Sequence, residues 1–146
     1  MSNLLNISEA ASLAFHTMAL LARTSPEERL TVHQIADAWG VSANHLAKVM
    51  PRLTRAGLTE SVRGPTGGFR LARPANQITL LEIYEAVEGP AGGSRCLLKQ
   101  RACDDNRCLL GELAHRIHDD VYRYFEQTTL AKLAEGFGDK IEITLN

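Results

Sequence analysis

The sequence has no long hydrophobic run, few aromatic residues and no closely spaced cysteine pair. Aromatic side chains make up only 5% of its 146 residues, and no apolar run approaches the roughly 20 residues that span a bilayer. The chain does not start with a basic segment followed by an apolar one, so we expect a cytoplasmic protein with no membrane partner. Because Cys-X-X-Cys pairs, nucleophile elbows and phosphate-binding loops are also missing, we expect no enzymatic activity.

The charge of the chain is unevenly distributed. A hydrophobic content of 45% is enough for one packed domain, and the net charge is only −1. Residues 42–74 nevertheless carry six basic side chains and one acidic side chain, a net charge of +5. Residues 75–146 carry eight basic and twelve acidic side chains, a net charge of −4. A short cationic block in a nearly neutral chain indicates a defined surface for a polyanion.

Three helices are predicted in the first part of the chain. A capping pattern at residues 6–9 precedes the apolar run 10–22, and a second pattern at 31–34 opens a helix that Gly40 ends. Ser42 is a natural N-cap for the third helix, and two helices joined by a short glycine-containing turn are typical of a helix-turn-helix. The third helix is expected to turn Leu46, Val49, Leu53 and Leu58 inward, and Asn44, His45, Lys48, Arg52 and Arg55 outward.

A proline lies inside the third predicted helix. Because Pro51 removes one backbone hydrogen bond, we expect this helix to bend or break between Met50 and Leu53. Its N-terminal half, residues 42–50, is then expected in the major groove of DNA.

A β-hairpin is predicted next. Residues 60–63 and 69–72 have the pattern of two short strands around the glycine-rich turn 64–68. The turn combines backbone N–H groups free of side-chain bulk with Arg63 and Arg70, which suits phosphates or a narrow minor groove. The hairpin is therefore expected to be the wing of a winged helix-turn-helix.

Two more helices are predicted in the second half. A capping pattern at residues 79–82 begins a short helix that ends near Gly89. Beyond the last cysteine, apolar positions recur at intervals of three and four residues: Leu110, Leu113, Ile117, Val121, Tyr124 and Thr128. A stripe of this length is better buried against a second copy than left in water, so we expect all but the last of these residues at the interface of a C2 homodimer.

The expected fold class is mainly α with a small β-wing, a winged helix-turn-helix domain followed by a long C-terminal dimerisation helix. The predicted DNA-binding domain covers residues 1–89 and is followed by a cysteine-containing sensor loop at 90–108. The dimerisation helix is predicted at 109–135, and the tail 136–146 is expected to form a short strand at 140–144 or to stay disordered.

All three cysteines, Cys96, Cys103 and Cys108, lie close together in one polar segment. They cannot all pair within one chain, and structural disulfides are rare in a reducing compartment. Thiolates this close in sequence can hold one soft metal centre, although zinc is less favoured because the two-residue spacing of zinc knuckles is missing. Oxidation to a sulfenate or disulfide, and three inert thiols, are the alternatives.

Several of these segments together carry a family resemblance. They are the helix pair 31–58, the wing 63–73 with its Gly-Gly-Phe, the segment 78–89 with its Ile-Thr-Leu, and the clustered cysteines. With them, the chain resembles the Rrf-two family of winged-helix transcription regulators, which has IscR- and NsrR-like members, up to about Leu133. The resemblance implies a homodimer crossed through the C-terminal helix. It also implies an iron–sulfur cluster, [2Fe-2S] or [4Fe-4S], held by the three cysteines, with DNA affinity set by the state of the cluster.

The resemblance also assigns site residues. The recognition helix of the family matches Ser42, Asn44, His45, Lys48 and Arg52, and its wing matches Arg63, Thr66, Gly67, Gly68 and Arg70. Where some members have an acidic fourth cluster ligand this chain has Ser12, and where others have a histidine it has Gly111. The candidates for a fourth ligand are therefore Glu9, Ser12, His16, His115, an aspartate of the cysteine segment or a small molecule.

These observations predict a DNA-binding transcriptional regulator, interpreted as a repressor or dual regulator. Its partner is double-stranded DNA with a near-palindromic operator, and its affinity follows the iron–sulfur or redox state of the three cysteines. A cluster-free thiol or small-ligand sensor of the same fold is the first alternative. An iron–sulfur carrier that does not bind DNA is the second, although a carrier has no use for a basic wing.

Overall fold

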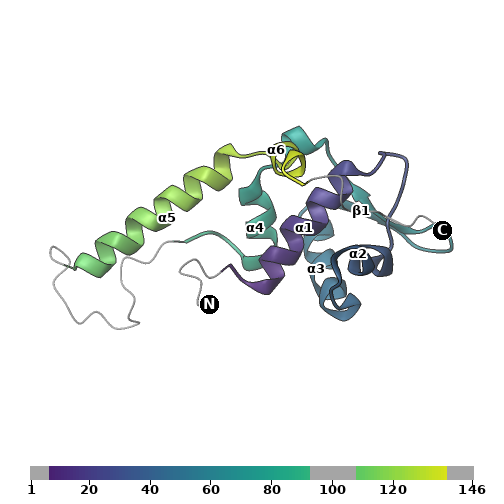
Figure 1. Cartoon of the computed structure of the whole chain (residues 1–146), viewed down its shortest axis with the longest axis horizontal. Helices are drawn as coiled ribbons and strands as arrows, with labels where there is room; N and C mark the ends of the chain where they lie inside the picture. Colours follow the sequence, from purple (N-terminus) through teal and green to yellow (C-terminus); the bar gives the residue numbers. More distant parts are fainter. Residues whose placement is uncertain (1–6, 93–107, 138–146) are drawn as a thin grey trace.

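The computed structural model describes residues 7–92 and 108–137 of the chain. Its elements are α1 (Glu9–Arg23), α2 (Val32–Trp39), α3 (Ala43–Arg55), β1 (Thr59–Val62), β2 (Gly68–Leu71), the 3-10 turn η1 (Ala75–Gln77), α4 (Leu80–Glu88), α5 (Leu109–Gln127) and α6 (Leu130–Glu135). All of them except α5 gather into one head, and α5 leads away from it (Figure 1). The fold is mainly helical with a small two-stranded wing, as predicted. None of the described helices is long and apolar enough to cross a membrane.

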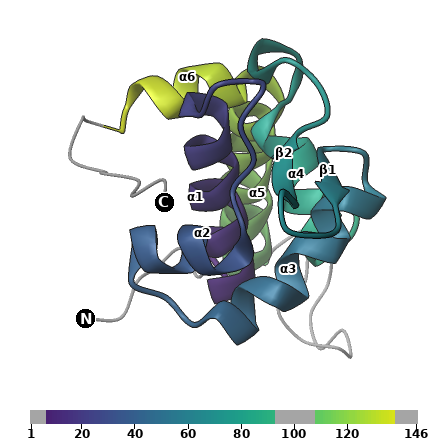
Figure 2. The ribbon, with the colours of Figure 1, turned by 90° about the vertical axis from the view of Figure 1, so that its right-hand side faces the viewer.

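Helix α1 forms the centre of the head, where it contacts α2, α3, α4 and α6 (Figure 2). Its N-cap is Ser8, whose Oγ accepts a hydrogen bond from the Ala11 N–H at 3.0 Å. The capping box predicted at residues 6–9 is therefore wrong, since Glu9 is already inside the helix, and Asn6 lies outside the described residues. The largest fully buried side chains of the surrounding core include Met18, Leu20, Ile35, Leu46, Met50, Ile83 and Leu130.

The helix-turn-helix follows the sequence prediction closely. The Gln34 N–H donates to Thr31 Oγ1 at 3.2 Å and the Thr31 N–H donates to Gln34 Oε1 at 2.9 Å, so the predicted capping box of α2 is confirmed. Gly40 ends α2 with a φ of 63°, a left-handed conformation that glycine adopts without steric cost. Because α2 ends at Gly40 and α3 already begins at Ala43, the turn between the two helices is short.

Helix α3 does not break at its proline. It runs without interruption from Ala43 to Arg55, with Pro51 exposed on its outer side, so of the bend or break expected between Met50 and Leu53 the break is wrong and the bend stays a prediction. The four positions predicted to face inward, Leu46, Val49, Leu53 and Leu58, are all buried. Ser42 occupies the N-cap position, but its side chain makes no capping hydrogen bond.

The wing is an antiparallel pair whose strands each begin one residue before the predicted position. The chain just before α2 adds a bridge to it, with the Leu30 N–H donating to the Phe69 carbonyl at 3.0 Å and the Phe69 N–H to the Leu30 carbonyl at 2.8 Å. A Cβ on Gly68 would lie 2.8 Å from the Leu30 carbonyl oxygen, so only glycine fits at this crossing. The wing is thus fixed to the start of the helix-turn-helix.

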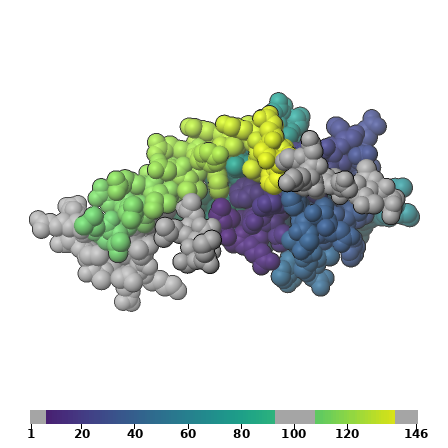
Figure 3. All heavy atoms as spheres, in the orientation of Figure 1, coloured from purple at the N-terminus to yellow at the C-terminus, as the bar shows by residue number. Residues whose placement is uncertain are grey.

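The helix predicted over 109–135 is two helices. Thr128 and Thr129 are extended because they cross the start of α4: the Leu80 N–H donates to the Thr128 carbonyl at 3.0 Å and the Leu130 N–H to the Ile78 carbonyl at 2.8 Å. Thr129 then caps α6, whose Leu130 enters the core beside α1. Helix α5 is left as a separate arm that projects beyond the head (Figure 3). The strand considered at 140–144 lies outside the described residues.

Candidate nucleic-acid interface

One face of α3 is open to solvent. The buried stripe of α3, formed by Leu46, Val49, Met50 and Leu53, packs into the head and leaves the polar positions outside. All of the residues predicted to contact DNA from this helix are exposed: Ser42, Asn44, His45, Lys48 and Arg52. A helix with a free polar face at this position in a helix-turn-helix is suited to the major groove.

Two of these side chains have partners from other elements. Nδ1 of His45 lies 3.0 Å from Oε1 of Glu9 in the first turn of α1. Nη1 of Arg52 donates to the Val87 carbonyl at 2.9 Å, at the C-terminal end of α4. Since these partners are 36 and 35 residues away in the chain, no local sequence pattern could have indicated them. Arg52 is exposed, as predicted, but its guanidinium is also hydrogen-bonded to the protein.

The wing presents one free arginine and one paired arginine. Arg63 and Thr66 are exposed near its tip, whereas Gly67 and Gly68 are half-buried. Both Nε and Nη2 of Arg70 donate to Oε2 of Glu60, at 3.0 and 2.9 Å, because these two residues are direct cross-strand neighbours. Among the described residues, Lys48, Arg55 and Arg63 therefore remain as the exposed cations of this face with neither an ion pair nor a side-chain hydrogen bond.

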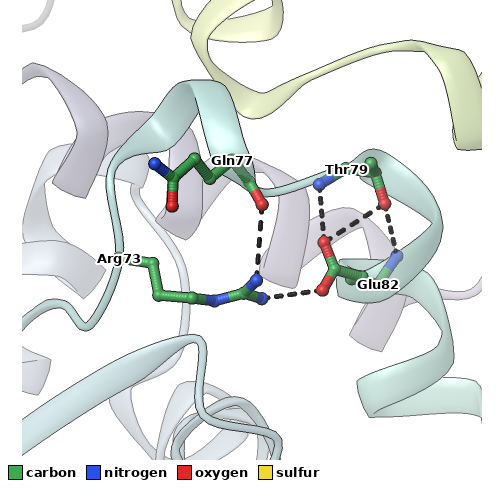
Figure 4. A network of polar contacts seen from close by, with 4 residues as sticks. All are labelled: Arg73, Gln77, Thr79 and Glu82. Atoms are coloured by element: carbon green, nitrogen blue, oxygen red, sulfur yellow. Dashed lines mark hydrogen bonds and ion pairs between the residues drawn. The ribbon is translucent and has the colours of Figure 1, made fainter.

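Arg73 belongs to the structural framework of the head (Figure 4). Its Nη2 donates to Glu82 Oε1 at 2.7 Å and its Nη1 to the Gln77 carbonyl at 3.3 Å, while the Thr79 N–H donates to Glu82 Oε2 at 2.9 Å. Burial acts to raise the pKa of Glu82, but these hydrogen bonds and the charge of Arg73 outweigh it, so the pKa lies below its usual value. The predicted capping box of α4 is confirmed by the same contacts.

Of the three cysteines, only Cys108 is among the described residues. It is half-buried at the N-cap of α5, where its Sγ accepts a hydrogen bond from the Gly111 N–H at 3.2 Å. Cys96 and Cys103 lie outside the described residues, so the proposed cluster site is not seen as a whole. Within residues 7–92 and 108–137, no group of three or more His, Cys, Asp and Glu side chains could hold a metal ion.

Three of the described candidates for a fourth ligand, Glu9, His16 and His115, already have side-chain partners. Nδ1 of His16 donates to the Ser12 carbonyl at 2.7 Å, and its ring packs edge-on against Trp39 and Phe137. His115 lies 3.3 Å from Asp119, one turn along α5. Glu9 is paired to His45.

The apolar stripe of α5 is open in the single chain. Leu109, Leu110, Leu113, Ile117 and Tyr124 are between 44% and 82% exposed. Val121 is half-buried and, with Ile117, lines a cavity of about 330 Å³ between α4 and α5. A patch of this kind on a projecting helix is typical of a protein-protein contact.

Comparison with known proteins decides the family. Residues 7–136 match the Rrf2 (Rrf-two) family, described as "Iron-dependent Transcriptional regulator". The chain belongs to this family. CymR of B. subtilis, whose structure is titled "the Global Cysteine Regulator", is similar to the chain with a TM-score of 0.78 and 29% identity over 92% of this chain and 100% of CymR. IscR of T. potens is similar with a TM-score of 0.71 and 25% identity over 90% and 87%.

Sequence relatives agree with the structural ones. A protein of Aquifex aeolicus assigned to the HTH-type transcriptional regulators is 30% identical over 129 residues, 86% of this chain and 89% of that protein. BadM of Rhodopseudomonas palustris, assigned to the same class, is 48% identical over 58 residues, which are 40% of this chain but only 37% of BadM. The Rrf2 relatives are regulators rather than enzymes, as the sequence predicted.

Proposed function

We propose that this Rrf2-family regulator binds a near-palindromic operator as a homodimer and represses transcription, with an operator affinity that depends on its three cysteines. The observation that carries the proposal is the open polar face of α3 beside a wing with the free cation Arg63. The exposed stripe of α5 supports pairing of two such heads.

In the proposed complex, each α3 enters a major groove. The two helices of a dimer then lie roughly 34 Å apart, one turn of DNA. Asn44 and His45, near the N-terminus of α3, are assigned to base edges, and Lys48 and Arg63 to phosphates. The proposed contact set is completed by Ser42, Thr66, Gly67, Gly68 and Arg70. Arg52 belongs to it through the N–H groups that its bond to the Val87 carbonyl does not use.

The cysteine chemistry fits an iron–sulfur centre. Cys96, Cys103 and Cys108 would hold it together with a fourth ligand, since thiolates are the donor groups that such clusters use, and an N–H donor such as that of Gly111 stabilises a metal-bound sulfur. A bound cluster, [2Fe-2S] or [4Fe-4S], would supply a centre that responds to iron and to oxidants. The family description, which names iron, favours this reading over a cluster-free thiol or ligand sensor.

The C-terminal end of α4 offers a route from the cysteines to α3. The chain enters the cysteine segment directly after α4 and the residues 89–92. The last turn of α4 accepts the hydrogen bond of Arg52, and Glu88 accepts one from Ser8 at the start of α1. We infer that a change in the cysteine segment reaches α3 through these contacts and alters operator affinity.

A DNA-binding assay tests the first part of the proposal. Fluorescence anisotropy with operator and unrelated duplexes, over a salt series, is expected to show salt-dependent binding with operator preference. Arg63→Ala is expected to weaken all duplexes by a similar factor, because a phosphate contact carries no base information. An operator-selective loss in this variant would contradict the phosphate role of Arg63.

Anaerobic purification tests the second part. The protein is expected to show a visible absorption spectrum, with iron and sulfide in equal amounts, and Cys103→Ala is expected to lose the spectrum and its response to oxidants. Ser61→Ala, an exposed wing position outside the cysteine segment, serves as the matched control. A colourless, iron-free protein with full operator affinity would contradict the cluster and favour a thiol or ligand sensor.

A further inference from the structure

The contact between α1 and the exposed face of α3 joins an acid to a histidine. Oε1 of Glu9 lies 3.0 Å from Nδ1 of His45, and 73% of the Glu9 side chain and 54% of the His45 side chain are exposed. Exposed pairs of this kind contribute little to stability. The ion pair therefore adds little to stability, and what the acid does stabilise is the N-terminus of α1, where a carboxylate is favoured whether or not His45 is near.

The surroundings of this pair are cationic. A small cleft of about 190 Å³ between α1 and α3 is lined by Glu9, Ala10, Leu13, His45, Lys48, Val49 and Arg52, and Glu9 is its one acidic residue. On a surface that faces phosphates, a carboxylate opposes DNA binding. Its presence beside Lys48 is understandable if the contact with His45 has a use that outweighs this repulsion.

Glu9 is held in place independently of DNA. It occupies the first turn of α1, directly after the N-cap Ser8, whose hydroxyl also donates to Glu88 at the end of α4. The carboxylate therefore has a backbone position fixed from two elements. A side chain anchored in this way can restrict the ring of His45 before DNA arrives.

We propose that Glu9 is a positioning residue for base reading by His45, an inference that rests on the proposed DNA-binding function. A carboxylate only accepts hydrogen bonds, so the contact requires the proton on Nδ1 and leaves Nε2 for a base edge. Without Glu9, the ring can rotate and can carry its proton on either nitrogen. His45 then no longer presents one hydrogen-bonding character to the major groove, and discrimination at its base pair is lost.

The test compares four variants with the wild type. Glu9→Ala removes the acceptor, Glu9→Gln keeps an oxygen acceptor without the charge, and His45→Ala removes the reader. Glu135→Ala, on α6, removes one exposed negative charge far from α3 and serves as the control. The affinities of each protein are measured for an operator and for duplexes changed at one base pair at a time.

The expected result separates positioning from charge. His45→Ala and Glu9→Ala lose roughly fivefold or more of the discrimination at the same base pair, whereas Glu9→Gln and Glu135→Ala keep it. Both Glu9 variants bind unrelated DNA more tightly than the wild type, because both remove a negative charge from the DNA face. The proposal is overturned if Glu9→Ala keeps full discrimination at the base pair assigned to His45. It is also overturned if His45→Ala loses no discrimination at any base pair.

A measurement without DNA keeps the proposal independent of the proposed function. Ring nitrogen chemical shifts of His45, assigned by comparison with His45→Gln, report which nitrogen carries the proton. A fixed Nδ1–H form in the wild type and Glu9→Gln, and a mixture in Glu9→Ala, supports the proposal even if no operator is found. The same mixture in the wild type overturns it. A wild type that binds no DNA, with Nδ1–H fixed, contradicts the proposed function instead.

Discussion

Two arginines predicted to contact DNA are each held by another part of the protein. Arg52 donates to the Val87 carbonyl, and Arg70 donates twice to Glu60 across the wing. A guanidinium can make such bonds and still approach a phosphate, because it has five N–H donors in one plane. Lys48 has no such partner among the described residues, so its charge is available in full.

This contrast predicts different effects for two substitutions on the same helix. Arg52→Ala is expected to lower the free energy of unfolding by about 1 kcal/mol, because a charged hydrogen bond to the end of α4 is lost. Lys48→Ala is expected to leave stability unchanged and to reduce the salt dependence of DNA binding by about one ion. Urea unfolding measures the free energy of unfolding of both variants, and binding constants over a salt series measure the salt dependence. Equal stability losses would contradict the structural role of Arg52.

The lowered pKa of Glu82 makes stability depend on pH. The carboxylate is favoured in the folded protein, so its contribution is complete above its usual pKa of 4.5 and is lost as the pH falls through the lower folded value. The difference in free energy of unfolding between the wild type and Glu82→Gln is therefore expected to be constant near neutral pH and to shrink under acid conditions. Urea unfolding over a pH series that starts at neutral pH and falls below the usual carboxyl pKa measures it.

At the scale of elements, the wing depends on a close approach between two backbones. Gly68 has a φ of 139°, and a Cβ there would lie 2.8 Å from the Leu30 carbonyl oxygen. The bridge between Leu30 and Phe69 fixes this spacing. The Gly-Gly sequence at the wing is therefore explained by packing against the chain before α2 as well as by the turn.

Gly68→Ala is expected to destabilise the protein by about 2 kcal/mol, because it adds backbone strain and forces the Leu30 segment away. Operator affinity should fall with it, since the wing loses its fixed position. Gly92→Ala is the matched control, because its Cβ would meet only the Pro90 carbonyl oxygen at 4.0 Å. Thermal unfolding compares the two variants. A Gly68→Ala protein as stable as Gly92→Ala would show that the wing can shift without cost.

At the scale of the whole molecule, one chain leaves α5 incompletely covered. The head packs around α1, whereas Leu110, Leu113 and Ile117 remain exposed on the projecting arm (Figure 3). Burial of this stripe in a symmetric pair would remove it from water and give two α3 helices a fixed separation. The arm and the operator spacing are thus linked in the proposed function.

Leu113→Asp is expected to convert the proposed dimer to a monomer, because a charge on this stripe cannot be buried without a partner. Light scattering coupled to size exclusion measures the mass, and operator affinity should fall because only one head can bind at a time. Glu126→Lys changes the charge on the other side of the same helix and should remain dimeric. A dimeric Leu113→Asp protein would exclude this stripe as the interface.

The sequence by itself determined the elements that depend on near neighbours. The capping boxes at Thr31 and Thr79 and the inward stripe of α3 follow from residues three or four positions apart, and the end of α2 follows from Gly40 itself. The family resemblance followed from the same local motifs. These signals were sufficient because each hydrogen bond or packing face joins residues within one or two turns of chain.

Only the tertiary structure decided the partners of the site residues. The bond of Arg52 to Val87 and the contact of His45 with Glu9 join positions far apart in the chain, and nothing local distinguishes these side chains from free ones. The division of α5 from α6 has the same origin, because backbone contacts with the start of α4 hold Thr128 extended where periodicity alone favours a helix. Long-range contacts, set by how the head packs around α1, therefore decide which residues of the predicted interface are free to read DNA.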